Sequence, residues 1–134
     1  MRGDCDGALL AQILERGYRA MANDRECLIC MRECMTRIQH YAAGGRGDFM
    51  NSTLMQDAVL WNLQLLSSAA LRVSAACKSE RRELNWGHVC GLFREVAQDP
   101  WHLEPEAIWQ CVERELPAIR RNLAAIMRPT TGQY

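Results

Sequence analysis

The side chains best suited to chemistry gather at one corner of the sequence, within residues 86–109. A helical apolar pattern breaks there at residues 99–100, and a new one starts after residues 104–105, because proline fits a first helical turn but not a helix interior. Arg94 and His102 flank the break and could supply a cation and a proton shuttle. The proline between them interrupts the helical geometry that would place both on one face, so we regard this pair as the weaker hypothesis.

Three cysteines form a second candidate cluster. Cys27, Cys30 and Cys34 recur at i, i+3 and i+7 on the flank of a predicted helix. Three thiols so placed could bind a metal or respond to oxidation, but no fourth ligand is near, and cysteine often packs as a small apolar residue. We predict packing and no cofactor, with a metal or redox sensor as an alternative.

Apolar residues recur with the period of a helix throughout the chain, and no segment alternates like a strand. This predicts an all-α antiparallel bundle of four main helices, preceded by an N-terminal helix. Residues 44–51 are predicted to be a glycine-rich linker, and residues 77–85 a charged connector. The predicted helices cover residues 8–22, 25–43, 52–76, 86–98 and 105–127.

The last predicted helix has an apolar face made of Ile108, Val112, Leu116 and later residues at the same spacing. Pro117 lies inside this pattern and is predicted to kink the helix. Along the chain we predict an N-terminal extension with a short helix over residues 1–23, a helical domain over 24–127 and a flexible tail over 128–134.

Composition narrows the class of protein. The chain has 134 residues with a formal net charge of zero, which fits one domain without an overall nucleic-acid or membrane signature. No apolar run approaches the ~20 residues needed to cross a bilayer. Seven cysteines are an odd number, and we predict a cytoplasmic protein with reduced thiols.

Several blocks of sequence, in order, resemble the HepT-like family, also called DUF86, of the HEPN superfamily of small helical ribonuclease domains. The blocks are DRECLICMRECMTRIQHY over residues 24–41, DAVLWNL over 57–63, the tryptophan and Gly-Leu pair within 86–92, and EAIW with ELPAI over 106–119. The resemblance implies a homodimeric ribonuclease toxin paired with a small nucleotidyltransferase antitoxin.

The resemblance also implies a motif, Arg-x4-His-x-Tyr, that begins in the fourth helix. The family's arginine and histidine act on the scissile phosphate of RNA, and the antitoxin adenylylates the tyrosine. A gapless alignment places Phe93, Gln98 and Pro100 at these positions. A slip of one residue recovers Arg94 but then places Asp99 and Trp101 where histidine and tyrosine belong.

These departures lead us to predict that the catalytic site has been lost. The family's Gly-Glu-Ala in the preceding helix is also replaced, by residues 67–69, so its acidic group is missing. We therefore predict a catalytically degenerate, homodimeric binding or regulatory module. We predict an interface that includes Ser67, Ser68, Phe93 and Trp101, with RNA binding weak. The first alternative is an active ribonuclease toxin that uses Arg94 and His102.

Overall fold

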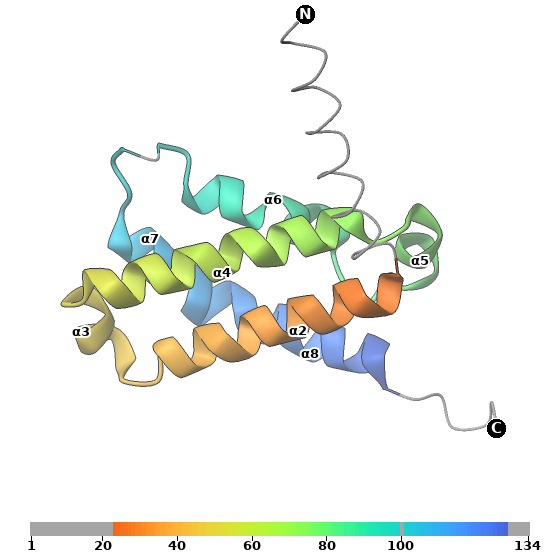
Figure 1. Ribbon diagram of the computed structural model, residues 1–134, viewed down its shortest axis with the longest axis horizontal. Helices are drawn as coiled ribbons and strands as arrows, with labels where there is room; N and C mark the ends of the chain where they lie inside the picture. Colours follow the sequence, from red (N-terminus) through yellow and green to blue (C-terminus); the bar gives the residue numbers. More distant parts are fainter. Residues whose placement is uncertain (1–22, 100, 129–134) are drawn as a thin grey trace, which may run out of the picture.

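The computed structural model describes residues 23–99 and 101–128, and all regular structure in these ranges is helical (Figure 1). The predicted all-α class is confirmed. The helix predicted over residues 8–22 and the tail beyond residue 128 lie outside the described residues. In chain order the elements are α2 (Asp24–Tyr41), α3 (Gly45–Met50), α4 (Thr53–Arg72), α5 (Ala75–Glu80), α6 (Trp86–Val96), α7 (Pro105–Gln110), the π-helical turn η1 (Cys111–Glu115) and α8 (Leu116–Met127).

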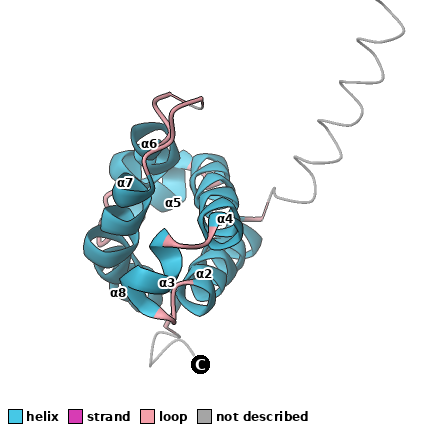
Figure 2. Ribbon diagram, turned by 90° about the vertical axis from the view of Figure 1, so that its left-hand side faces the viewer, coloured by secondary structure: helices cyan, strands magenta, loops and turns pink. Residues whose placement is uncertain are grey.

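The long helices pack around one apolar core. Figure 2 looks along the bundle and shows α2, α4, α6, α7 and α8 arranged around its centre. α4 is the central element, since it packs against both α2 and α6, and α8 completes the bundle beside α2. No helix in the described ranges is both long and apolar enough to cross a membrane. The largest fully buried side chains include Met31, Met35, Ile38, Phe49, Leu63, Leu66, Leu92, Ile108 and Leu123.

Two predicted helix starts are confirmed by their caps. The side chain of Asn23 accepts a hydrogen bond from the backbone N–H of Arg25 at 2.9 Å, at the start of α2. Asn85 does the same for His88 at 3.2 Å, at the start of α6. Each cap satisfies a donor that the first helical turn leaves unpaired.

The glycine-rich segment is not merely a linker, because it contains α3. Gly45 starts this helix with φ at +88°, a left-handed conformation that favours glycine. Phe49 is fully buried, and its ring centroid lies 5.3 Å from that of Trp109. The prediction missed α3 because six residues are too few to show a helical period.

The predicted third helix is also wrong at its end, where α4 stops at Arg72 and not at residue 76. Ser74 breaks it and caps α5 by accepting a hydrogen bond from the backbone N–H of Cys77 at 3.1 Å. The carboxylate of Asp24 accepts hydrogen bonds from the backbone N–H of Ser74 at 2.8 Å and from its hydroxyl at 2.6 Å. This tertiary contact ties the start of α2 to the start of α5.

Candidate functional site

The candidate site lies where α6 turns into α7. α6 buries Val89 and Leu92 in the core and ends at Val96, two residues before the predicted end. The chain then forms an irregular connection until Pro105 opens α7. Figure 1 shows this connection at the edge of the bundle, between the ends of α6 and α7.

A carboxylate and an imidazole are paired in this connection. Oδ2 of Asp99 lies 2.7 Å from Nδ1 of His102, and Oδ1 of Asp99 accepts a hydrogen bond from the backbone N–H of Trp101 at 3.1 Å. The imidazole side chain is 81% exposed. Asp99 therefore orients His102, but both groups lie in open solvent.

The other catalytic candidates do not join this pair. Arg94 is exposed on the last turn of α6, and no hydrogen bond or ion pair connects it to His102 in the described structure. Gln98 is exposed beyond the end of α6, and Trp101 is 89% exposed. Pro100 lies outside the described residues. The described structure thus shows no direct hydrogen bond or ion pair between the candidate cation and the candidate proton shuttle.

Phe93 belongs to the packed side of α6. Its side chain is half-buried against the core, and its backbone N–H donates a hydrogen bond to the hydroxyl of Ser67 at 3.1 Å. The Ser67 hydroxyl in turn donates to the carbonyl of Val89 at 2.9 Å. Ser67 is only 5% exposed, so this residue joins α4 to α6 inside the monomer, whereas Ser68 is half-buried.

A hollow of about 260 Å³ lies between α6 and the α7–η1 segment. Its polar rim is formed by Glu95, Gln110, Arg114 and Glu115, and neither Arg94 nor His102 lines it. Near this hollow, Nε2 of His88 lies 2.8 Å from Oε2 of Glu115 and links α6 to η1. Two carboxylates, Glu95 and Glu115, and one guanidinium, Arg114, line this hollow, so it does not present the uniformly positive surface that a phosphate would favour.

The cysteine cluster is mostly part of the core. Cys27 and Cys34 are buried, and Cys30 is half-buried beside them. Burial, with a smaller contribution from the neighbouring Cys30, raises the pKa of the Cys34 thiol to about 12. Since the thiolate is the form that binds metals and reacts with oxidants, this environment disfavours both roles for Cys34. No group of three metal-ligating side chains occurs in the described ranges.

One comparison decides the family. A family model described as ribonuclease HepT-like matches residues 31–126, which is well over half of the chain. The chain belongs to the HepT-like ribonuclease family. No solved structure matches it.

The HepT-like match covers the elements that build the candidate site. It begins inside α2, runs through α4, α6 and the connection, and ends one residue before the end of α8. Phe93, Arg94, Gln98 and the Asp99–His102 pair therefore all lie within the matched part of this HepT-like chain.

Sequence reasoning missed two pairs in this region. The sequence carries a signal for the Asp99–His102 pair, because the two residues are three positions apart and a proline, a residue type that often marks turns, lies between them. The His88–Glu115 pair joins residues 27 positions apart. No local pattern predicts that contact, which depends on how α6 packs beside η1.

Proposed function

We propose that this HepT-like protein is catalytically silent and acts as a dimeric binding or regulatory module. Its relatives by resemblance are the ribonuclease toxins of toxin–antitoxin pairs. The observation that carries the proposal is the environment of Phe93, the position that the resemblance assigns to the cationic arginine. An apolar ring, half-buried against the core, cannot neutralise the charge that develops on a phosphate during cleavage.

The other two assigned positions support the same conclusion. Gln98 has an amide side chain that does not titrate near neutral pH, so it cannot shuttle a proton. Pro100 carries no hydroxyl, so it cannot accept the adenylyl group that the family's tyrosine receives. The three replacements together remove the groups needed for RNA cleavage and the hydroxyl whose adenylylation would regulate it.

One observation favours the alternative, an active ribonuclease with a relocated histidine. A carboxylate on Nδ1 leaves Nε2 of His102 available, and this arrangement is common in general bases. The imidazole is nevertheless 81% exposed, and Arg94 makes no contact with it. Water-exposed groups that are not held together lose the benefit of a preorganised site, so we prefer the silent protein.

The test is cleavage of a labelled RNA by purified protein. We expect no cleavage by the wild type, and no change in His102→Ala or Asp99→Asn. A general base contributes about 10²–10⁴ in rate, so a relocated site would lose roughly that factor in His102→Ala. Wild-type cleavage that disappears in this variant would establish the alternative.

A gain of function tests the same proposal from the other side. The triple variant Phe93→Arg, Gln98→His and Pro100→Tyr restores the side chains that the resemblance assigns to the family's motif. If those side chains are the only defect, the variant cleaves RNA. An inert variant with an unchanged circular dichroism spectrum would mean that the RNA-binding surface is lost as well.

The proposed binding role includes two kinds of partner. A second copy of the chain would cover exposed aromatic surface at Phe93 and Trp101. A small nucleotidyltransferase related to the family's antitoxins would be the second, and pull-down with such a protein expressed beside this one tests it. Ser67 and Ser68 were predicted at the dimer interface as well. The buried Ser67 contacts α6 of its own chain, so of these two serines we propose only Ser68 for the interface, beside Phe93 and Trp101.

A further inference from the structure

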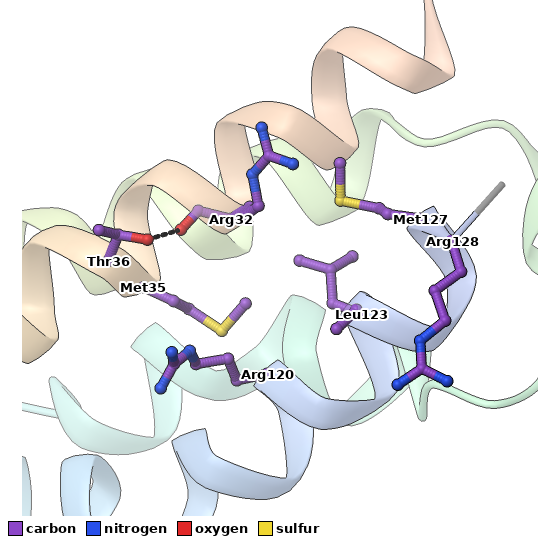
Figure 3. A pocket seen from close by; sticks show the side chains of 8 residues that line it. Arg32, Met35, Thr36, Arg120, Leu123, Met127 and Arg128 are labelled. Carbon is purple, nitrogen blue, oxygen red and sulfur yellow. Dashed lines mark hydrogen bonds between the residues drawn. The ribbon is translucent and has the colours of Figure 1, made fainter.

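A groove runs between α2 and α8, on the opposite side of the bundle from α6. It has a volume of about 400 Å³ and is lined by three residues of α2 and five from α8 and its end (Figure 3). A smaller hollow of about 80 Å³ follows along the same two helices and shares Met35 and Arg120 with it. Because they share these two residues, the two hollows adjoin each other.

The floor of this groove is apolar. Met35 and Leu123 are almost fully buried, and Met127 is half-buried beside them. Flexible methionine side chains adapt to the shape of an incoming apolar surface. The hydroxyl of Thr36 is already engaged, since it donates a hydrogen bond to the carbonyl of Arg32 at 3.0 Å. No aromatic side chain from the described residues lines the groove, so these residues offer no ring on which a nucleobase would stack.

The rim of the groove is basic on both walls. Arg32 belongs to α2, Arg120 to α8, and Arg128 follows the end of α8; all three are exposed. None of them forms an ion pair with a carboxylate in the described part of the chain. Figure 3 shows the three guanidinium groups at separate points around the apolar floor, pointing away from one another.

This separation decides the kind of ligand. Guanidinium groups that bind one phosphate converge on it, often in bidentate contacts, and these three do not converge. Several carboxylates spaced along an extended partner would match them, with apolar side chains between those carboxylates on the floor. We propose that the α2–α8 groove binds an acidic amphipathic helix of a partner protein, with its apolar face on the accessible side chains of Ala124 and Met127 above this floor.

Two other occupants fit less well. A second copy that used the same groove would bring arginines against arginines, and like charges repel. Residues 1–22 of the chain carry three arginines against two aspartates and one glutamate, so they lack the negative charge that the rim would attract. The inference does not depend on whether the α6–α7 corner is catalytic, because none of its residues lines the groove.

The experiment uses a labelled synthetic helical peptide and the full-length protein. The peptide carries leucines at i, i+3, i+4 and i+7 with glutamates on both flanks, and binding is followed by fluorescence anisotropy. One control peptide replaces each glutamate with lysine, and another replaces each leucine with serine. We expect saturable binding of the acidic amphipathic peptide alone, weakening as salt increases.

Matched variants locate the binding site. Arg32→Glu with Arg120→Glu reverses charge on both walls, and we expect Kd to rise by roughly tenfold or more. Ala124→Trp fills the groove from an exposed position and should weaken binding comparably. Arg82→Glu reverses an exposed charge in the connector before α6 and should leave Kd unchanged. Circular dichroism checks that each variant keeps its helices.

Several results would overturn the inference. They are absence of saturable binding by the wild type, equal binding of the lysine peptide, and equal effects of Arg82→Glu and the groove variants. A single-stranded oligoribonucleotide provides the last arm. If it binds and the double reversal abolishes that binding while the acidic peptide does not bind, the groove is a nucleic-acid surface and the proposal fails.

Discussion

At the scale of single residues, Ser67 is, with Asn62, one of two buried polar side chains in the described part of the chain. Its hydroxyl accepts from the backbone of Phe93 and donates to the carbonyl of Val89 while almost fully buried. We expect Ser67→Ala to lower the free energy of unfolding by about 1 kcal/mol, the usual net value of an internal hydrogen bond. Urea unfolding measures it.

The neighbouring residue provides the control for this measurement. Ser68 is half-buried, and we expect Ser68→Ala to change stability by less than about 0.5 kcal/mol. Equal losses in the two variants would mean that the bridge between α4 and α6 contributes nothing specific. The pair therefore separates a buried hydrogen bond from a general preference for serine in this helix.

Buried thiols give the protein a pH dependence in alkaline solution. Burial raises the pKa of Cys111 from 9.0 to about 12, so the unfolded chain releases this proton at a lower pH than the folded chain. The contribution to stability is therefore fully present below pH 9.0 and is lost as pH rises toward about 12. We expect Cys111→Ala to flatten the fall in unfolding free energy over that range; an unchanged slope would contradict this.

At the scale of elements, the π-helical turn η1 explains a core position that the sequence did not indicate. Val112, predicted on the buried face, is half-buried against the core, but Cys111 beside it was not predicted there and is only 4% exposed. The backbone N–H of Leu116 donates to the carbonyl of Cys111, five residues back. The wider turn brings Cys111 and Leu116, five positions apart, to the same face of the helix, which packs on the core. In an α-helix two residues at this spacing would point in different directions.

This turn also accommodates Pro117, which was predicted to kink the helix. Proline lacks the donor that an α-helix interior requires and crowds the preceding turn. Here the widened turn precedes it, and α8 continues from Leu116 to Met127. A local change from α-helix to π-helix thus accommodates the missing N–H donor and the bulk of Pro117.

A deletion tests this account. Removing Arg114 together with Pro117→Ala should convert η1 to α-helix and keep Leu123 and later residues facing the core, so the protein should fold. Removing Arg121 instead should rotate the end of α8 by about 100°. Exposing its buried leucine and isoleucine should cost several kcal/mol, since one buried Leu or Ile side chain contributes about 2–5 kcal/mol. Thermal unfolding distinguishes the two deletion variants. Equal stability of the two would contradict the proposed role of η1.

Local sequence patterns predicted individual helices, but they did not predict contacts between residues far apart in the chain. The long apolar stripes are local, so they predicted α2 and α6 well. α3 was missed because its helical signal comes from one buried ring, Phe49, that packs on Trp109 far along the chain. The arginines of the α2–α8 groove lie about ninety residues apart in sequence, and only the packing of α2 on α8 brings them together.

At the scale of the whole molecule, zero formal charge conceals an uneven surface. Arginines rim the α2–α8 groove, while large aromatic side chains are exposed on other elements. Trp101 is 89% exposed in the α6–α7 connection, and Trp61 is 57% exposed on α4. Large exposed aromatic side chains are common in protein interfaces. This distribution fits a molecule with two different contact surfaces, one apolar and one basic.

We expect the α6–α7 connection around Trp101 to form a homodimer interface, and light scattering at micromolar concentration would detect the dimer. A tryptophan at the centre of an interface often contributes about 2 kcal/mol or more, so Trp101→Ser should weaken association by roughly thirtyfold. Trp61→Ser is the matched comparison, because it removes the same side chain from α4 and should leave the dimer intact if the α6–α7 connection forms the interface. The reverse result would move the interface to α4, and a monomeric wild type would remove the dimer from the proposed function. Since the groove rim lies on other elements, Arg32→Glu with Arg120→Glu should leave the dimer unchanged.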